Sequence, residues 1–434
     1  MQNIHNIVEK QRAFFNTNTT LDVNWRIDQL IRLKIAVQTY EKEIMQALQE
    51  DLGRCETEAY LTDIGPLILE INEAIAHTKK WAKPEVHFSG IQCFPSVITK
   101  VFKMPYGVTL IMSPFNFPIL LTLGVLAASI SAGNTAVLKT SSKSSHCTAV
   151  MKKLIETTFD EKYIALIDGG HDVADACLAE RFDKIFYTGS PNVGRHVMHA
   201  AAEYLTPVAL ELGGENGNWC IIRKDADIKD AAEKIAFFKA CNSGQICINI
   251  NQIAIEHSIA EPFIEELKKA FTKQLGTTPH ANKEYAHLIT EQAYDNCAKE
   301  AETYKDRIIF GGKGNRETLR FDPTIIYPVQ IDEPIVNHEL FNPLLPIVPY
   351  DNEEALLETI ASREHGLALY IFTHDTKRAE EIMSTMQYGG GCINEVCMHL
   401  MVRGVPFNGT GHSGMGAYHG EWGFREFTHP STVL

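Results

Sequence analysis

The stretch GVTLIMSPFNFPILLTLGVLAASISAGNTAVLKT, residues 107–140, decides the fold class. Its two end segments, GVTLIMS and TAVLK, are short and almost continuously apolar, which predicts strands that are buried on both faces. Between them lies the most apolar run of the chain, residues 119–133, which is too short and too rich in Ser, Thr and Gly to span a bilayer. We therefore predict a buried helix, and with it a strand–helix–strand unit of a parallel sheet.

The same alternation of strands and helices continues toward the C-terminus. Further strands are expected at YIALIDG, KIFYTGS and VALELGG, each separated from the next by a helical pattern. A second α/β run begins near residue 218 with NWCII and includes NQIAIE, TIIYPV, LPIVPY and LALYIFT. Helical spacing predicts long helices at 22–50 and 56–82, whereas the prolines and β-branched residues of 84–106 indicate an extended hairpin arm.

Composition excludes several classes of function. The 434-residue chain carries a formal net charge of −14, which argues against a nucleic-acid partner. Its ten cysteines form no C-x-x-C pair, so we expect no structural metal site. The N-terminus lacks the plan of a signal peptide, and no hydrophobic tail follows the last globular segment. We therefore expect a cytoplasmic protein without a membrane anchor.

The segment KACNSGQICINI, residues 239–250, contains two cysteines of different character. Either one could be a small core side chain, because free cysteine is among the most buried residue types. Cys241 ends a helical pattern and is interpreted as a packing residue. Cys247 follows the polar, turn-like residues 242–245, and Gly244 allows close approach by a ligand. This setting favours Cys247 as an accessible, reactive thiol.

Two polar residues are expected at the carboxyl ends of strands in the first sheet, where ligands of open α/β sheets bind. Glu211 ends VALELGG and could act as a general base, although on its own it could equally cap a helix or form an ion pair. Asn116, in SPFNFP, could donate its amide to a developing oxyanion, or could simply be a turn residue.

Two glycine-rich stretches were weighed as phosphate-binding loops. GTGHSG, residues 409–414, matches G-x-G-x-x-G, but it follows no clear strand and opens no apolar helix, so a flexible loop is favoured. GSPNVG, residues 189–194, lies at a strand-to-helix junction, where small residues expose helix N-terminal N–H groups to an anion.

Six segments together resemble motifs of the aldehyde dehydrogenase superfamily and occur in the family's order. They are SPFNFP (P-W-N-[FY]-P), GNTAVLKTSS (G-N-x-x-x-x-K-P-S-E), FYTGSPNVG (F-T-G-S-x-x-x-G), LELGGE (L-E-L-G-G-K), NSGQIC (N-x-G-Q-x-C) and HELFNPLLP (E-x-F-G-P-x-x-P). The short N-terminus and the ending FNGTGHSGMGAYHG are most similar to the class 3 branch. That branch typically forms dimers and oxidises medium-chain or aromatic aldehydes, so the resemblance implies a homodimer with such a substrate.

The resemblance implies a role for each matching residue. Cys247 would attack the aldehyde, Asn116 would hold the oxyanion, and Glu211 would activate the water that releases the acid. The residues implied to bind NAD or NADP are Ser113, Phe115, Lys139, Ser142, Gly189, Ser190, Gly194, Leu212, Glu339 and Phe341.

Several positions depart from the family's motifs. Ser142 replaces a glutamate that would repel the 2′-phosphate of NADP, so we expect NADP+ to be tolerated beside NAD+. Glu215 replaces a lysine, and Asn342 and Asn408 each replace a glycine. Because Asn tolerates a positive φ better than most residues, we expect the backbone to survive these two glycine replacements.

The sequence thus predicts an α/β fold with three parts. A Rossmann-like, parallel-sheet cofactor domain would comprise 1–83 and 107–210, and an α/β catalytic domain 211–402. A small β arm for oligomerisation would combine 84–106 with 403–434. The function expected is NAD(P)-dependent oxidation of an aldehyde to its acid. Two alternatives remain: a CoA-acylating aldehyde dehydrogenase, and a catalytically silent relative that acts as a binding protein.

Overall fold

The computed structural model describes residues 3–434. The first of the two large sheets has six strands. The strand order is β18-β7-β6-β3-β4-β5; all pairs are parallel except β18 with β7. The strands are β3 (Val108–Met112), β4 (Thr135–Lys139), β5 (Ile164–Ile167), β6 (Lys184–Gly189), β7 (Val208–Leu212) and β18 (Gly414–Met415).

Both faces of this sheet are covered by helices, as the continuously apolar strands predicted. In β3, Val108, Leu110 and Met112 join a core on one face, and Ile111 joins the core on the other. Helices α1 (Ile4–Phe15), α8 (His171–Leu178) and α9 (Pro191–Ala202) cover the first face. The second face is covered by α2 (Val23–Thr39), α3 (Glu41–Leu52), α5 (Gly65–Trp81), α6 (Leu120–Ala132), α7 (Ser145–Thr158) and α15 (Gly420–Glu426).

The apolar run at 119–133 forms helix α6, which confirms the prediction of a buried helix. Its side chains are buried on nearly every side, between the sheet and α2, α5 and α15. The helix ends at Gly133, whose φ of 98° closes it in the left-handed region that favours glycine.

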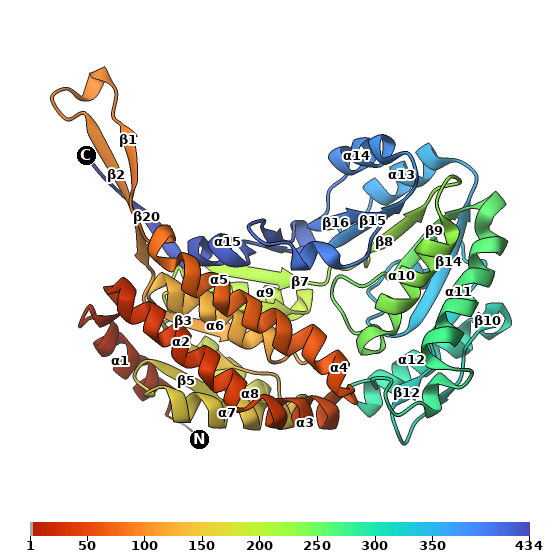
Figure 1. Ribbon diagram of the computed structural model, residues 1–434, viewed down its shortest axis with the longest axis horizontal. Coiled ribbons are helices and arrows are strands. Elements are labelled where there is room, and N and C mark those ends of the chain that lie inside the picture. Colours follow the sequence, from red (N-terminus) through yellow and green to blue (C-terminus); the bar gives the residue numbers. More distant parts are fainter. Residues whose placement is uncertain (1–2) are drawn as a thin grey trace.

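The second α/β run forms a seven-stranded sheet within residues 3–434 (Figure 1). The strand order is β10-β13-β14-β9-β8-β15-β16, and only β10 pairs in the antiparallel direction. Its strands are β8 (Trp219–Ile222), β9 (Gln252–Glu256), β10 (Ile308–Phe310), β13 (Thr324–Ile326), β14 (Leu344–Tyr350), β15 (Ala368–Phe372) and β16 (Gly390–Ile393).

Helices cover both faces of the second sheet as well. On one face lie α10 (Ile228–Ala240) and α11 (Ala260–Leu275), whose apolar residues belong to the same continuous core as those of α5 and α6. On the other face lie α12 (Glu291–Thr303), α13 (Glu353–Ala361) and α14 (Thr376–Thr385). The continuous core joins the two sheets, and the α/β fold with parallel sheets that the sequence predicts is confirmed.

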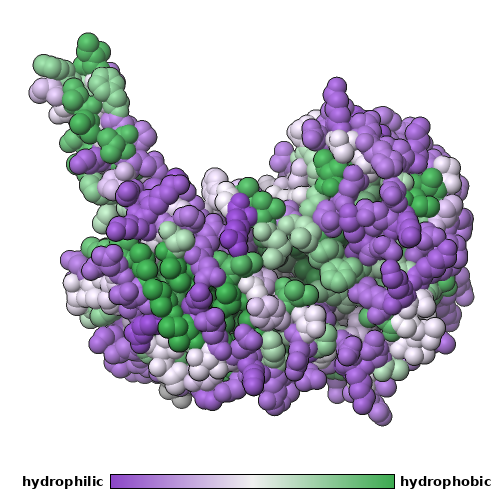
Figure 2. Space-filling model, in the orientation of Figure 1, coloured by the Kyte–Doolittle hydropathy of each residue, from purple (hydrophilic) through white to green (hydrophobic). Residues whose placement is uncertain are grey.

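Residues 84–106 form a projecting hairpin, as predicted. Strands β1 (Glu85–Phe88) and β2 (Ile98–Pro105) pair with each other, and β20 (Thr428–Val433) pairs with β2. The hairpin stands away from the molecule and carries apolar side chains on its surface (Figures 1 and 2). Phe88 and Ile91, for example, are 78% and 88% exposed.

The remaining elements are short. Among them are α4 (Glu56–Ala59), the π-helical turn η2 (Tyr60–Ile64), the 3₁₀ turns η4 (Cys241–Gly244) and η9 (Met398–Met401), and the strands β11 (Gly314–Asn315), β12 (Arg320–Phe321), β17 (Phe407–Asn408) and β19 (Ala417–Tyr418). The glycine-rich stretch 409–414 contains a 3₁₀ turn, Gly411–Ser413, and leads into the strand β18 and not into a helix. Within residues 3–434, no helix is both long enough and apolar enough to cross a membrane.

Candidate active site

The carboxyl ends of the first sheet gather most of the residues that the sequence singles out. Lys139 ends β4 and pairs in register with Met112, next to Ser113. Leu212 ends β7 beside Gly189 of β6, and Glu211 lies one position earlier beside Thr188. Because these strands run parallel, their ends form one edge, the edge at which open α/β sheets bind ligands.

Glu211 is a buried carboxyl group without a partner. It is 3% exposed, and neither of its carboxylate oxygens has a hydrogen-bond partner. It therefore neither caps a helix nor forms an ion pair among the described residues, the two alternatives that the sequence left open. Burial raises the pKa of Glu211 to about 7, so it can hold or release a proton near neutral pH.

Cys247 and Cys241 differ in their surroundings, as the sequence indicates. Cys241 follows the last residue of α10, with its thiol 3.5 Å from a carboxylate oxygen of Glu58. Cys247 is half-buried, and burial followed by the negative charges of Glu211 and Glu339 raises the pKa of its thiol well above the ordinary value. The thiol of the free protein is therefore neutral, and its reaction as a nucleophile requires a base.

The polar loop 242–245, which precedes Cys247, is buried and not exposed to solvent. Asn242, Ser243 and Gly244 all have positive φ, at 49°, 53° and 79°. The Asn242 side-chain amide donates to the carbonyls of Asn116 (3.1 Å) and Gln245 (3.0 Å). The turn-like composition therefore agrees with the backbone shape, and hydrogen bonds satisfy the polar groups of this buried loop.

Asn116 lies against the loop that carries Cys247. Its side chain is 2% exposed, and its amide donates to the main-chain carbonyl of Gln245 at 3.1 Å. A side-chain amide has two N–H groups, so one remains available to a ligand. Asn116 is therefore more than a turn residue, because its side chain is hydrogen-bonded to the loop that carries Cys247.

Lys139 and the 189–194 turn form a polar and open part of the edge. The ammonium of Lys139 donates to the carbonyls of Thr140 (2.7 Å) and Gly169 (2.8 Å), and burial lowers its pKa. Ser190 caps helix α9. A Cβ on Gly194 would come within 3.0 Å of Leu212, so glycine lets α9 pack closely on β7. These features fit a dinucleotide with its pyrophosphate at the start of α9.

The second sheet contributes Glu339 and Phe341 to the same place. A Cβ on Gly213 would lie 2.0 Å from a Glu339 carboxyl oxygen, so this carboxyl group lies directly against the end of β7. Burial, followed by the charge of Glu211, raises the pKa of Glu339 to about 8. The rings of Phe341 and Phe115 meet edge to face with their centroids 5.9 Å apart.

The structure accounts for some of the departures from the family's motifs. Glu215 pairs with Arg195 of α9, so a nearby cation compensates its charge, and the ring of His412 lies at hydrogen-bond distance, 2.8 Å, from its carboxylate. Asn342 accepts from the Leu344 N–H at 2.9 Å. Neither Asn342 nor Asn408 has a positive φ, so our explanation from left-handed backbone is wrong. Ser142 is exposed, and the ammonium of the adjacent Lys143 lies 5.2 Å from the Phe115 ring.

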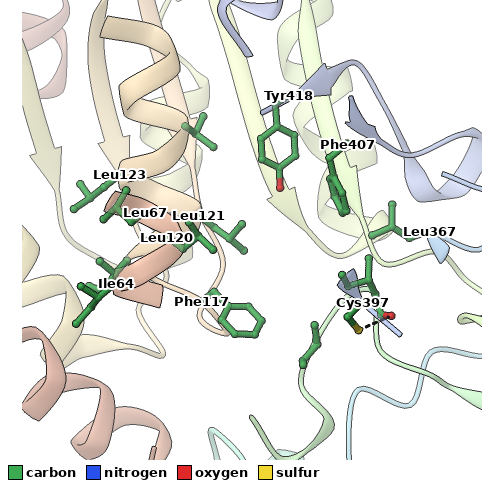
Figure 3. Packing of buried hydrophobic residues seen from close by; sticks show 14 of the residues in the cluster. Ile64, Leu67, Phe117, Leu120, Leu121, Leu123, Leu367, Cys397, Phe407 and Tyr418 are labelled. Carbon is green, nitrogen blue, oxygen red and sulfur yellow. Dashed lines mark hydrogen bonds between the residues drawn. The ribbon is translucent and has the colours of Figure 1, made fainter. Parts of the chain in front are cut away.

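Several residues near the site had no signal in the sequence. Arg54 and Asp63 form a fully buried ion pair behind Asn116 and Asn242. His419 and Glu70 pair at 2.6 Å. No local pattern marks these residues, because Arg54 also contacts Asn116 and Asn242, and Glu70 pairs with His419, all of them distant in the sequence. In Figure 3 the rings of Phe117, Phe407 and Tyr418 come from different segments of the chain and approach the centre of the view.

Comparison with known proteins places the chain in a family. Residues 1–433 match the model of the aldehyde dehydrogenase family. The chain is 36% identical to the 4,4′-diaponeurosporen-aldehyde dehydrogenase of Staphylococcus aureus, over 99% of this chain and 94% of that protein. It is 33% identical to the dimeric, NADP-preferring aldehyde dehydrogenase of Canis lupus familiaris, over 100% and 95%.

A solved structure agrees with these sequence matches. The substrate-bound state of Staphylococcus aureus AldH superposes with a TM-score of 0.97 at 35% identity, over 100% of this chain and 94% of that one. The fold and the site thus define an NAD(P)-dependent oxidoreductase. This chain belongs to the aldehyde dehydrogenase family, whose members oxidise aldehydes to carboxylic acids.

The burial of Cys247 generates a prediction about its thiol. Because burial and the nearby carboxylates raise its pKa, alkylation of Cys247 by iodoacetamide should accelerate steadily from about pH 6 to about pH 9 without levelling off. Quantitative mapping of the peptide that contains Cys247 measures this rate, with Cys247→Ser as the unlabelled control. A plateau below about pH 7 would mean that the site stabilises the thiolate and that this electrostatic account is wrong.

Proposed function

We propose that Cys247 is the nucleophile of this aldehyde dehydrogenase and Glu211 its general base. The observation that carries the proposal is the unpartnered carboxyl of Glu211, buried near the thiol of Cys247. The Cys247 sulfur forms a bond to the aldehyde carbon, and the thiol proton passes to the Glu211 carboxylate, which releases it to solvent before the hydrolysis step. The carbonyl oxygen becomes an oxyanion that accepts the free N–H of Asn116 and the main-chain N–H of Cys247.

Residues at the carboxyl edge of the first sheet would hold NAD(P)+. Lys139 would contact the adenosine ribose, and Gly189, Ser190 and Gly194 would lie along the pyrophosphate. Glu339 would hold the nicotinamide ribose. The remaining contacts proposed are Ser113, Phe115, Ser142, Leu212 and Phe341. When bound, the coenzyme accepts the hydride from the carbon attached to the Cys247 sulfur, which leaves a thioester.

Glu211 completes the reaction by hydrolysis. Its carboxylate removes a proton from water, the resulting hydroxide adds to the thioester carbon, and the carbon–sulfur bond breaks to give the acid and the free thiol. Retention of Glu211 favours water over coenzyme A as the acceptor. Retention of Cys247, Glu211 and Asn116 argues against a silent relative.

The base assignment predicts both a loss of activity and a pH step. Glu211→Gln should lower kcat by about 100-fold or more, because the amide cannot accept the proton. In the wild type, kcat should rise as pH increases through about 7, where Glu211 loses its proton, and the variant should lack this step.

Formation of the reduced coenzyme from medium-chain and aromatic aldehydes measures both effects. Cys247→Ser serves as the control for the nucleophile and should be inactive. If Cys247→Ser turned over aldehyde at the wild-type rate, another residue would be the nucleophile.

Coenzyme choice should depend on Ser142. We propose that both NAD+ and NADP+ are used, because the exposed Ser142 and its neighbour Lys143 leave room for a 2′-phosphate. Ser142→Glu should reduce kcat/KM for NADP+ by about tenfold or more through charge repulsion and leave NAD+ within about threefold. NAD+ is thus the internal control, and equal losses with both coenzymes would show that Ser142 does not select between them.

The substrate proposed is a medium-chain aliphatic or an aromatic aldehyde. Residues from α5, α6 and the 400–403 segment line a small cavity, with Leu69, Leu120, Leu400, Met401 and Val402 as apolar wall residues and Glu70, Glu73, Arg403 and His419 as charged or polar ones. The apolar part of this lining suits an aliphatic chain or a ring. We also propose a cytoplasmic location and the division into cofactor domain (1–83 and 107–210), catalytic domain (211–402) and arm (84–106 with 403–434).

We propose that the arm joins two copies in a homodimer. Its side chains Phe88, Ile91 and Phe94 are each more than three-quarters exposed, and a protein surface rarely leaves such a group uncovered. The relative from Canis lupus familiaris is named as a dimeric enzyme, and it aligns with 100% of this chain.

Replacing Phe88, Ile91 and Phe94 together by Ser should convert the dimer to a monomer, which light scattering measures. Leu205→Ser, at an exposed position outside the arm, is the control. A wild-type monomer would contradict the proposal.

A further inference from the structure

We infer that Arg54 is a positioning residue for the reaction, through its simultaneous contacts with the Asn116 loop and the Cys247 loop. The inference rests on the proposed roles of Asn116 and Cys247. Arg54 lies between α3 and α4 and is 1% exposed. Neither the family motifs nor the sequence patterns single it out.

The three nitrogens of the Arg54 guanidinium contact three different segments. Its Nε donates to the Asn242 side-chain oxygen at 3.0 Å, and one Nη donates to Asp63 at 2.5 Å. The other Nη donates to the main-chain carbonyl of Asn116. The planar fork of arginine can meet three acceptors in fixed directions, whereas a lysine ammonium is a compact point charge on a flexible stem.

These contacts fix the two loops relative to each other. Asn242 is the first of the three consecutive residues with positive φ that turn the chain toward Cys247. Non-glycine residues adopt this conformation at a cost and need surrounding contacts to hold it. Glu58 supplies a second anchor, since its carboxylate accepts the Asn242 main-chain N–H at 2.5 Å. Arg54 thus bonds both to the loop that bears the oxyanion amide and to the loop that bears the nucleophile.

Asp63 connects the same group to a third segment. Its second oxygen accepts the Leu120 N–H at 2.7 Å, at the start of α6. Asp63 lies in the π-helical turn η2, a geometry that occurs frequently at functional sites. The guanidinium also lies 4.5 Å from the Phe117 ring centroid, so the consecutive residues Asn116 and Phe117 both contact Arg54.

Complete removal of Arg54 would leave Asp63 buried without a counter-ion, which destabilises a protein strongly. Arg54→Lys avoids this difficulty because the ammonium can still pair with Asp63 but cannot contact Asn242 and Asn116 at once. We expect kcat to fall by about 100-fold, the size of effect that misplacement by about 1 Å produces, while the Kd for NAD+ changes less than about threefold.

The matched control is Lys184→Arg. Lys184 and Glu426 form another buried ion pair, at the amino end of β6 and therefore at the opposite end of the strand from the site. Lys184→Arg alters a buried ion pair but leaves the Asn116 loop and the Cys247 loop unchanged. We expect its kcat to stay within about twofold of the wild-type value. Thermal unfolding of both variants shows whether each remains folded at the assay temperature.

A double-mutant cycle separates positioning from a general loss of structure. If Arg54 acts by placing Asn116, Arg54→Lys should lower kcat much less in an Asn116→Ala background than in the wild type. Equal losses in both backgrounds, or a wild-type kcat for Arg54→Lys, would overturn the inference. Failure of the proposed function looks different: there Cys247→Ser would stay active, or the wild type would reduce no coenzyme with any aldehyde.

Discussion

The site depends on burying a polar loop between two sheets. Residues 242–245 are small or amidic, yet all four are buried where the cores of the two sheets join. A buried amide without a partner costs about 1–3 kcal/mol, so each must find an acceptor or a donor. The partners come from Asn116, Arg54, Glu58 and His287, each outside the loop. These hydrogen bonds hold the loop 242–245 in place, and with it Cys247 at the end of the first sheet.

The same burial sets the chemistry of the ionisable groups. Glu211 and Glu339 lie close together in a poorly solvated place, and the pKa of each is raised, to about 7 and about 8. The charge of Glu211 raises the pKa of Glu339, so near neutral pH the pair does not carry two full negative charges. A neutral Glu339 can donate a hydrogen bond to a ribose hydroxyl, and Glu211 keeps a pKa near the working pH of a general base.

The sequence predicts the sheets, the buried helix and the arm because each has a local signature. Continuous apolar strands and the run 119–133 are visible in one short window, and so is the β-branched hairpin 84–106. Strand ends and motifs also single out Cys247, Glu211 and Asn116, the residues that we propose for catalysis. Arg54 and Asp63 were not, because their importance comes from partners more than fifty residues away, such as Asn116 and Asn242. The burial of 242–245 could not be predicted for the same reason, since composition does not show what covers a loop.

The central claim, that Cys247 carries the substrate covalently, is tested most directly by trapping the acyl group. Wild-type protein would be mixed with hexanal and NAD+ at about pH 6, where Glu211 is largely protonated and hydrolysis is slow. The mixture would be quenched in acid after a few turnovers and mapped by mass spectrometry. We expect the hexanoyl group on the peptide that contains Cys247, with the modification at that sulfur. Finding it on Cys241, or on no cysteine while reduced coenzyme accumulates, would contradict the account.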